Sequence, residues 1–360
     1  MKVLFDYQIF TEQKYGGISR YFANLNEGIN AHPGMESKLG LLFTNNAYLK
    51  NQQLPAGFLN GHVQKESRRI KYNKWYCKYL LRQNDFDIFH PTYYSPYFLK
   101  SLKKPFVLTV HDMIHELFPQ YFDPAADPKV YKGKAIEQAD HIIAISECTK
   151  KDILKFYDVR DDKISVIHHG FKMQTDEEKK NDFVIESNYI LFVGDRGGYK
   201  NFELFIRAAA SIILKHSINV ICAGGGAFKA EEIKTLTELN IVNNVKQLNV
   251  TDGQLRNLYR NALAFVYPSL YEGFGLPILE AFFNSCPVIL SNTSSLPEVA
   301  GDAAQYFDPN DEQSITNAIE QVITDNSKRN ELKAKGAERL KQFSFENCLQ
   351  KTIQVYRSLS

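Results

Sequence analysis

Short apolar runs alternate with longer stretches of helical period along almost the whole 360-residue chain. The runs have the length of buried β-strands, and the stretches between them repeat apolar positions every three to four residues, as amphipathic helices do. Strands separated by helices are joined by right-handed crossovers and form parallel sheets. The expected strands form two series, at 3–5, 88–89, 106–110, 141–145 and 164–167, and at 189–193, 220–223, 245–248, 263–267 and 288–290.

A polar segment without a clear apolar period separates the two series, and a strand restarts at Tyr189. After Ser344, a plausible N-cap, the chain ends in an amphipathic helix whose apolar stripe needs a surface to cover. The sequence does not say which domain covers it, and the N-terminal domain is one candidate. We expect an α/β chain of two doubly wound domains, with a first domain at 1–171, a linker at 172–187, a second domain at 188–343 and a C-terminal helix at 344–360.

The charge of the chain is nearly balanced but unevenly distributed. Lysine and arginine number 43 and aspartate and glutamate 41, and this net charge of +2 excludes a general binder of nucleic acid. Up to Gly170 there are 23 basic and 18 acidic residues (+5), and beyond it 20 and 23 (−3). Apolar residues make up 44% of the chain, which excludes intrinsic disorder as the main architecture.

The basic surplus of the first half is concentrated in Lys65–Arg82, where seven cations and one acid, Glu66, are interleaved with aromatic residues. A basic aromatic helix can lie on anionic lipid, where each cation near the surface contributes ~1 kcal/mol. A solvated helical face is the alternative, and the sequence favours neither. Contact with a membrane surface through this segment is therefore one of two open hypotheses.

The cysteines indicate a reducing compartment. The five are odd in number, lie more than sixty residues apart and form no Cys-x-x-Cys pair, which is typical of buried cytosolic thiols. The first ten residues carry no secretion-signal pattern, and no run approaches the ~18 apolar residues of a membrane span. We expect a cytoplasmic location, at the inner face of the membrane if the basic segment binds lipid.

The segment at 269–288, SLYEGFGLPILEAFFNSCPV, carries the strongest candidate chemistry. A strand ends before it, two glycines follow, and Pro277 marks a helix start, so free backbone N–H groups lie where a diphosphate can bind. Glu272 and Glu280 flank this site. Carboxylates are unfavourable beside phosphate but accept hydrogen bonds from sugar and ribose hydroxyls, so the pair indicates a sugar nucleotide. A helix-start carboxylate for Glu280 and a solvated turn for Glu272 are the alternatives.

These residues resemble the Glu-x7-Glu motif of retaining glycosyltransferases of family 4, which have the GT-B fold of two Rossmann-like domains with parallel sheets facing across a cleft. The likeness includes residues 295–304, SLPEVAGDAA, and covers nearly the whole chain. It implies that Glu280 holds the nucleotide ribose and that Glu272 contacts the donor hexose. Ser285 departs from the family, because relatives often have glycine in this turn. The backbone N–H groups implied to hold the β-phosphate or the sugar are those of Phe274, Gly275 and Leu276.

Two cations follow the strand at 189–193, in the sequence GDRGGYKN. Arg196 and Lys200 on a glycine-bearing turn between a strand and a helix are suited to stabilise a diphosphate leaving group without a metal. The family commonly has an arginine and a lysine here, so the resemblance implies this task for both. An idle surface cation is the alternative for Lys200, and the helix dipole disfavours it.

A second glycine loop, at 224–226, follows the strand at 220–223. The Gly-x-Gly-x-x-Gly fingerprint of dinucleotide binding fails here, because Lys229 occupies the place of the third glycine. The resemblance instead places Gly224 and Gly225 near the donor.

The first half contributes a glycine pair and a histidine. Gly16 and Gly17 precede a helical stripe and so lie at a helix N-terminus, and the resemblance brings this loop to the donor phosphates and the acceptor. His111 follows the strand at 106–110, at the strand end where α/β sheets bind ligands, and resembles the family's active-site histidine. With His115 it also has the His-x3-His spacing of a helical zinc site, but the first histidine ends a strand, so we expect no metal.

The resemblance implies an enzyme that moves a hexose from a nucleotide diphosphate sugar to a saccharide or lipid-linked saccharide, with retention of configuration, in cell-surface polysaccharide synthesis. GDP-mannose is the first donor hypothesis and a UDP-hexose the second; the donor is a substrate, and no cofactor is expected. A sugar-nucleotide epimerase or a phosphorylase on the same fold, or a sugar-binding protein without catalysis, are the alternatives.

Overall fold

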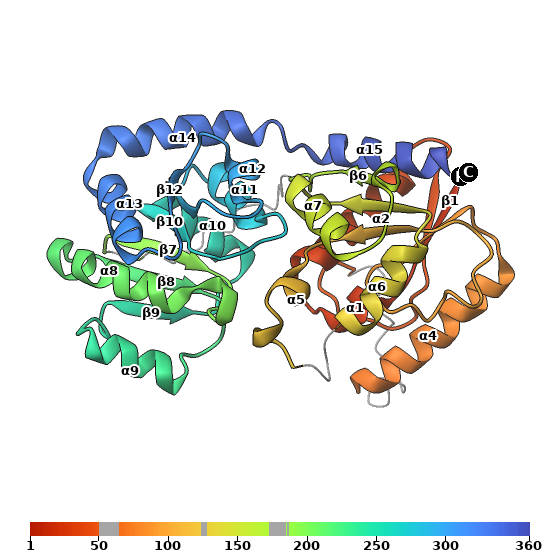
Figure 1. Ribbon diagram of the computed structural model, residues 1–360, viewed down its shortest axis with the longest axis horizontal. Helices are drawn as coiled ribbons and strands as arrows, with labels where there is room; N and C mark the ends of the chain where they lie inside the picture. Colours follow the sequence, from red (N-terminus) through yellow and green to blue (C-terminus); the bar gives the residue numbers. More distant parts are fainter. Residues whose placement is uncertain (50–64, 124–127, 173–184, 186) are drawn as a thin grey trace. The chain divides into compact units, whose positions relative to one another are not determined.

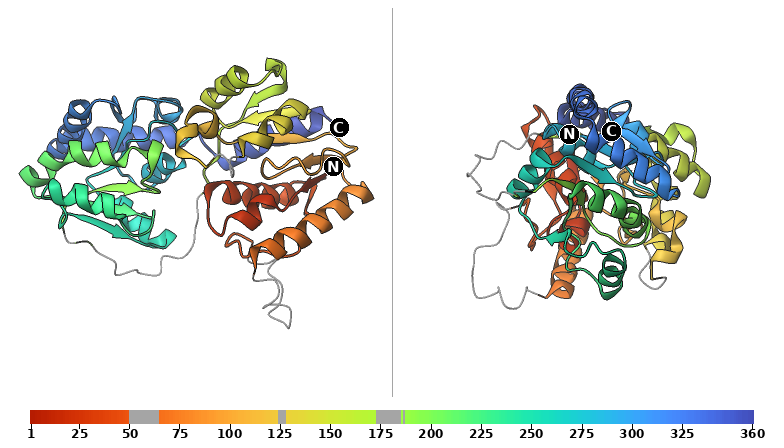
Figure 2. Two further views of the ribbon diagram at one scale, coloured as in Figure 1. Left: turned by 60° about the horizontal axis from the view of Figure 1, so that its bottom comes forward. Right: turned by 90° about the vertical axis from the view of Figure 1, so that its left-hand side faces the viewer.

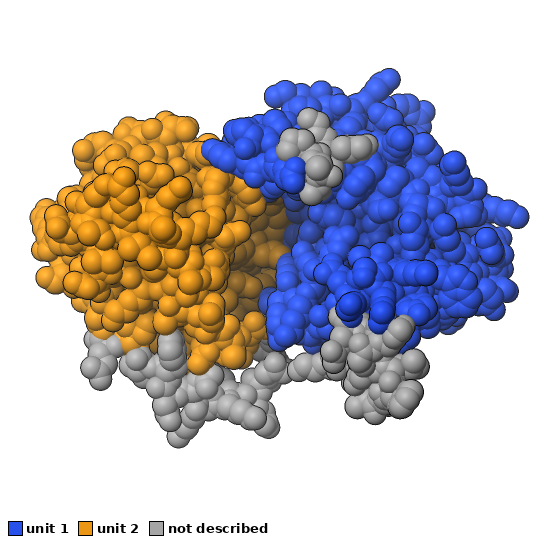
Figure 3. Space-filling view, turned by 90° about the horizontal axis from the view of Figure 1, so that it is seen from below, with its two compact units in different colours: residues 1–170, 345–360 blue, residues 171–344 orange. Residues whose placement is uncertain are grey.

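The computed structural model describes residues 1–49, 65–123, 128–172, 185 and 187–360. Within them the chain divides into two compact units (Figure 3). Unit 1 comprises Met1–Gly170 and Phe345–Ser360, and unit 2 comprises Phe171–Ser344. Each unit is an α/β structure with parallel strands, as the alternation of apolar runs and helical stretches predicts. The linker expected at 172–187 lies largely outside the described residues.

The sheet of unit 1 has the strand order β2-β1-β3, which continues through a parallel bridge between Phe89 and Phe106 into β4-β5-β6. All its strand pairs are parallel. Its strands are β1 (Lys2–Phe5), β2 (Glu36–Leu39), β3 (Ile88–His90), β4 (Val107–Val110), β5 (His141–Ala144) and β6 (Ile164–Val166). Its helices are α1 (Gln8–Glu12), α2 (Gly17–Ala31), α4 (Glu66–Gln83), α5 (Ile114–Leu117), α6 (Lys129–Gln138), α7 (Glu147–Phe156) and α15 (Phe345–Ser358), with short 3-10 helices η2 (Pro119–Tyr121) and η3 (Asp161–Lys163).

The alternation of side chains along β1 divides the helices of unit 1 between two clusters (Figures 1 and 2). Val3 and Phe5 pack in one apolar cluster with residues of α2 and α15. Leu4, which points to the opposite face, packs in another with residues of α4, α6 and α7. Helices therefore cover both faces of the sheet, and the carboxyl ends of its strands stay available for the loops that carry candidate chemistry.

Helix α15 belongs to unit 1, where it packs on α2. Its buried residues Ile353 and Tyr356 share a cluster with Phe22 of α2. The Tyr356 hydroxyl also lies 2.6 Å from Nδ1 of His90, at the end of β3. The apolar stripe predicted for this helix is the face that is buried.

The sheet of unit 2 is six-stranded and parallel, in the order β12-β11-β10-β7-β8-β9. This is a doubly wound order, because the chain starts at the centre with β7 and builds outward in both directions. Its strands are β7 (Tyr189–Val193), β8 (Asn219–Ala223), β9 (Val245–Leu248), β10 (Ala264–Tyr267), β11 (Val288–Ser291) and β12 (Gln305–Phe307). Its helices are α8 (Phe202–His216), α9 (Ala230–Glu238), α10 (Asp252–Asn261), α11 (Leu276–Phe283), α12 (Leu296–Ala300), α13 (Glu312–Thr324) and α14 (Asn326–Leu340), with a 3-10 turn η4 (Gly198–Lys200).

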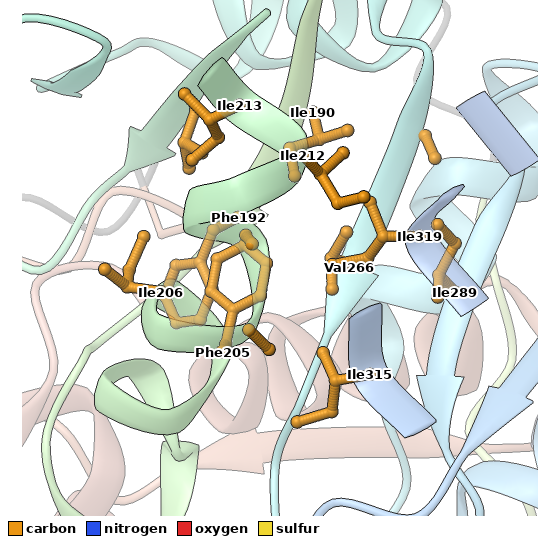
Figure 4. Packing of buried hydrophobic residues seen from close by; sticks show 14 of the residues in the cluster. Ile190, Phe192, Phe205, Ile206, Ile212, Ile213, Val266, Ile289, Ile315 and Ile319 are labelled. Carbon is orange, nitrogen blue, oxygen red and sulfur yellow. The ribbon is translucent and has the colours of Figure 1, made fainter. Parts of the chain in front are cut away.

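The core of unit 2 lies between this sheet and helices α8 and α13 (Figure 4). Phe192 of β7 and Val266 of β10 meet side chains of the two helices, among them Phe205 and Ile319. Fully burying an isoleucine or phenylalanine side chain contributes about 2 kcal/mol, so the cluster holds the central strands firmly. The turns that follow β7 and β10 are thereby fixed beside each other.

No helix within the described ranges is both long and apolar enough to cross a lipid bilayer. All five cysteines are free thiols, and four of them are buried.

Candidate active site

A glycine turn joins β10 to α11 in unit 2. Gly275 caps α11 with φ +100°, a left-handed conformation that glycine adopts at little cost. A Cβ at this position would lie 3.0 Å from Cδ1 of Ile278 and 3.1 Å from Cδ2 of Leu296. The N–H groups of Gly275 and Leu276 have no acceptor within the described part of the chain. The turn therefore presents hydrogen-bond donors at a helix N-terminus, where the dipole favours an anion.

Lys200 and Glu272 meet beside this turn. Nζ of Lys200 lies 2.7 Å from Oε1 of Glu272, and the two side chains are only 16% and 10% exposed. The ammonium group also lies over the rings of Tyr199, at 5.1 Å, and Tyr267, at 5.6 Å. Lys200 follows β7 and Glu272 follows β10, which are neighbours in the sheet. The structure thus brings together a cation and a carboxylate that the sequence assigns to the leaving group and the sugar.

Three residues to which the sequence analysis assigned no role hold Glu272 in place. Its N–H donates to Oγ of Ser294 at 3.0 Å, and its carbonyl oxygen accepts from Oγ of Ser295 at 2.8 Å. The Tyr267 side chain hydrogen-bonds to Glu272, and burial together with the charge of Glu272 raises the pKa of Tyr267 well above its usual value. The polar residues that follow β11 could have indicated the two serines. Tyr267 could not be recognised in this way, because it looks like the last residue of an ordinary buried strand.

Glu280 and Phe274 complete the expected donor contacts of this segment. Glu280 is partly buried on α11 and accepts a hydrogen bond from the Tyr259 hydroxyl at 3.4 Å. The Phe274 ring packs edge-on against Phe343, with ring centroids 5.8 Å apart, and the residue is buried. Ser285 adopts φ +53°, so the turn into β11 keeps a left-handed residue without glycine at a cost of about 1 kcal/mol.

Arg196 is placed differently from Lys200. Its side chain is 3% exposed and forms an ion pair with Glu232, with Nε 2.8 Å from Oε1. It also donates to carbonyl oxygens of the loop that contains Gly224 and Gly225. These contacts do not favour the expected contact between Arg196 and a diphosphate, because its donor groups are already engaged. The arrangement favours a role in shaping the glycine loop.

In unit 1, Gly16 and Gly17 lie at the start of α2, as predicted. A Cβ at Gly16 would overlap Oε1 of Gln13. That oxygen accepts a hydrogen bond from the N–H of Ser19 at 3.2 Å. Glycine at this position therefore lets a glutamine side chain cap the helix, so part of the expected anion site is occupied by the chain itself.

His111 lies at the end of β4 and is buried, with 4% of the residue exposed. Neither ring nitrogen has a hydrogen-bond partner within the described residues. The ring stacks on His169 at 5.7 Å and is contacted edge-on by Tyr21 and Phe22. Burial, with a smaller effect of His169, lowers the pKa of His111 well below its usual value. The imidazole is therefore neutral at pH 7, and both its nitrogens are buried.

A buried ion pair supports the backbone beside His111. Nζ of Lys132 donates to the carbonyl oxygen of Asp112 at 2.6 Å and lies 3.1 Å from Oε2 of Glu116. The same ammonium group lies over the ring of Tyr94, and the Tyr94 hydroxyl accepts from the N–H of His111 at 3.0 Å. Both charged side chains are at most 1% exposed. This network could not be predicted from the sequence, because its members lie in separate segments of the chain.

The possible zinc site at His111 and His115 has no support in the geometry. His115 stacks on Phe122, with ring centroids 4.0 Å apart, whereas His111 lies among Tyr21, Phe22 and His169. Across the described ranges no three or more histidine, cysteine, aspartate or glutamate side chains are grouped so that they could hold a metal ion.

Solved structures that match nearly the whole chain are glycosyltransferases of the GT-B fold. Anabaena HepE, solved with UDP and glucose, matches with a TM-score of 0.75 at 19% identity, over 100% of both chains. WaaG, a glycosyltransferase of lipopolysaccharide biosynthesis, matches with a TM-score of 0.70 at 14% identity, over 99% of both chains. At these identities the likeness establishes the fold, which is the GT-B fold that the resemblance implied.

The sequence itself places the chain within this class. The family described as Glycosyltransferase Family 4 matches residues 15–175, and Glycosyl transferases group 1 matches residues 173–339. The O-antigen chain mannosyltransferase B of Escherichia coli is 30% identical over 295 residues, which cover 76% of this chain and 74% of that protein. RfbU of Salmonella typhimurium, an O-antigen chain mannosyltransferase, is 32% identical over 215 residues, 58% of this chain and 59% of that one. The chain therefore belongs to glycosyltransferase family 4 and is a hexosyltransferase.

Proposed function

We propose that this enzyme transfers a hexose from a nucleotide diphosphate sugar to a hydroxyl of a saccharide or lipid-linked saccharide, with retention of configuration and without a metal. The observation that carries the proposal is the pair of Lys200 and Glu272, 2.7 Å apart. Glu272 lies in the segment whose turn offers the N–H groups of Gly275 and Leu276, and Lys200 contacts Glu272. A cation and backbone donors suit a diphosphate, and a carboxylate suits sugar hydroxyls.

The proposed donor contacts are those that the resemblance implies. Glu280 binds the ribose, Glu272 binds hydroxyls of the hexose, and Lys200 neutralises the diphosphate. We assign to the neutral imidazole of His111 a hydrogen bond with a hydroxyl of the donor hexose, because neither ring nitrogen has a hydrogen-bond partner within the described chain. The remaining proposed donor contacts are Gly16, Gly17, Gly224, Gly225 and the backbone of Phe274, Gly275 and Leu276.

The transfer step needs charge stabilisation more than a strong base. The bond between C1 of the hexose and the β-phosphate oxygen breaks, and the acceptor oxygen forms its bond to C1 on the same face. The acceptor proton goes to the departing phosphate oxygen, so the products are a glycoside and a nucleoside diphosphate. Lys200 and the turn N–H groups stabilise the charge on the leaving group, a contribution of about 3 kcal/mol per well-placed donor.

Mannose is the proposed hexose, because two relatives at about 30% identity are O-antigen chain mannosyltransferases. The donor is then GDP-mannose, with a UDP-hexose as the second choice, and the product belongs to a cell-surface polysaccharide. A panel of GDP- and UDP-hexoses, assayed for nucleotide release with and without lipid-linked saccharide acceptors, tests this. We expect acceptor-dependent release of GDP from GDP-mannose and an α-linked product by NMR. A donor changed without any acceptor would indicate an epimerase instead.

We also propose a cytoplasmic location and peripheral contact of helix α4 with anionic lipid. One face of α4 is buried through Asn73, Cys77, Leu80 and Leu81. The rest exposes Trp75 at 65% and Tyr79 at 47%, which stack with ring centroids 6.4 Å apart, among the cations of Lys65–Arg82. Aromatic rings with interleaved cations are suited to the headgroup region of a bilayer.

A flotation assay with vesicles of phosphatidylglycerol and phosphatidylcholine tests the contact. The variant with Lys71→Glu and Lys78→Glu should lose most vesicle binding. Its matched control, with Lys234→Glu and Lys341→Glu, makes the same change of charge at exposed lysines of unit 2 and should bind like the parent. Equal binding of both variants would reject α4 as the membrane surface.

A further inference from the structure

Arg196 is enclosed by acceptors that all belong to unit 2. Its Nε lies 2.8 Å from Oε1 of Glu232 and its Nη2 lies 3.3 Å from Oε2. The ring of Phe228 packs on the guanidinium, 4.6 Å from its centre. The other acceptors are four successive carbonyl oxygens, those of Gly224 at 3.2 Å, Gly225 at 3.5 Å, Gly226 at 3.0 Å and Ala227 at 3.1 Å.

The loop at 224–227 has a shape that this guanidinium maintains. Gly224, Gly225 and Gly226 have φ values of +92°, +72° and +70°, three successive left-handed residues. A Cβ at Gly225 would lie 2.7 Å from Nη1 of Arg196 and 2.8 Å from the carbonyl oxygen of Gly194. Each freely rotating residue loses about 1–2 kcal/mol of entropy when its backbone is fixed, so three glycines need strong contacts to hold one conformation. The guanidinium supplies these contacts.

We propose that Arg196 is a positioning residue that holds loop 224–227 in the conformation that receives the donor, and that Glu232 acts with it. The proposal rests on the proposed function, because it assigns the loop to the donor. Within the described chain, the N–H groups of Gly225, Gly226 and Ala227 have no acceptor, and these residues are exposed. With its carbonyl oxygens fixed by Arg196, the loop offers these N–H groups to the donor. Lys200 is then the cation that contacts the diphosphate directly.

The charge of Arg196 supports this division of tasks. Glu232 lies against the guanidinium with 17% of its side chain exposed, so the arginine charge is neutralised within the chain. Only 3% of the Arg196 side chain is exposed. A diphosphate that contacted Arg196 would therefore have to displace Glu232 and several carbonyl oxygens from the guanidinium. Charged hydrogen bonds of this kind are costly to leave unmade.

Substitution of Glu232 distinguishes positioning from direct contact, because the two roles of Arg196 predict opposite changes in the affinity for the donor. If Arg196 positions the loop, Glu232→Gln loosens it and raises the KM for the donor about tenfold, with kcat changed less than about threefold. Arg196→Met should also raise the KM for the donor. The double variant should have a donor KM no higher than that of Arg196→Met alone, since both residues act through one contact. Arg196→Lys should restore part of the lost affinity.

Hydrogen exchange of peptides that cover 222–230 provides a readout independent of activity. Exchange in this loop should accelerate in Glu232→Gln and Arg196→Met, while the peptide that covers Lys200 exchanges as in the parent. Tighter donor binding in Glu232→Gln, or unchanged exchange in both variants, would overturn the proposal. If the parent chain binds no nucleoside diphosphate in calorimetry, the proposed function fails instead, so the two failures are separable. Because Arg196→Met can fail to fold, Glu232→Gln and Phe228→Leu carry the test in that case.

Discussion

The contact between Lys200 and Glu272 has an experimental consequence for the product nucleotide. In the structure the two charges are 2.7 Å apart and mostly buried. A nucleoside diphosphate that binds Lys200 must compete with Glu272 for it. At an effective dielectric constant of about 20, two unit charges at 2.7 Å attract by roughly 6 kcal/mol, and loss of hydration offsets most of this, which leaves a net coupling of about 1–3 kcal/mol.

Glu272→Gln keeps the size of the side chain and removes the competing charge. The affinity for GDP or UDP without a sugar should therefore rise about tenfold, which corresponds to 1.4 kcal/mol. Hexose transfer should fall by about 100-fold or more, because the carboxylate contact to the sugar is lost. Isothermal titration calorimetry and a nucleotide-release assay measure the two effects on the same preparation.

Two variants serve as controls for this test. Lys200→Met should weaken nucleoside diphosphate binding, because the cation itself is removed. Glu280→Gln should also weaken it, because the proposed ribose contact is lost while the pair of Lys200 and Glu272 stays intact. If Glu272→Gln binds the nucleoside diphosphate no more tightly than the parent while Lys200→Met binds it more weakly, the competition between diphosphate and carboxylate does not exist.

Three further predictions concern backbone, stability and pH. Gly275→Ala should raise the donor KM, because the residue adopts φ +100° and an added Cβ would be crowded by Ile278 and Leu296. Gly34→Ala should leave KM unchanged, because that residue adopts φ +76° and an added Cβ would meet no described atom within 4 Å. Equal kinetics of both variants would reject a donor-binding turn. Lys132→Met should destabilise the chain in urea unfolding by about 3–5 kcal/mol, because the buried Glu116 loses its cation and keeps only a neutral donor such as the Tyr157 hydroxyl. Lys150→Met, whose partner Asp161 is 70% exposed, should cost less than about 1 kcal/mol. The third prediction concerns His90, whose pKa burial lowers to about 3. The folded chain therefore keeps the imidazole neutral, while in the unfolded chain the imidazole takes up a proton below its ordinary pKa of 6.5. The stability that His90 contributes is therefore lost as the pH falls. Between pH 7 and pH 5 the parent should therefore lose about 2 kcal/mol more than His90→Gln in urea unfolding, and equal losses would contradict the buried neutral imidazole.

The central strands and the edge strands β6 and β9 could be predicted from the sequence, whereas two other edge strands could not. Runs such as Tyr189–Val193 are almost wholly buried and read as continuous apolar stretches. The strands β2 and β12 were not expected, and both lie at the edge of a sheet. β2 has the sequence ESKL with only its last residue buried, so its polar side chains conceal it. The edge position, which permits those side chains, is a property of the tertiary structure.

The candidate site divides in the same way between local and distant contacts. Lys200 and Glu272 were found because each lies in a short segment with its own glycine turn, directly after a predicted strand. The environment of Arg196 was missed, because its partner Glu232 and the carbonyl oxygens of loop 224–227 come 28 to 36 residues later in the chain. Two cations four residues apart look equivalent in the sequence, and only the fold separates an arginine enclosed by its own chain from a lysine beside the candidate donor turn.

Hexose transfer by the parent chain and by two variants tests the proposed function most directly. The parent, Lys200→Met and Glu272→Gln should be incubated with GDP-mannose and a lipid-linked saccharide acceptor, and both GDP and the glycoside product should be quantified. We expect equal amounts of GDP and α-mannoside from the parent, and at most about 1% of that rate from either variant. Transfer at near-parent rates by both variants, with unchanged donor KM, would contradict the site at Lys200 and Glu272.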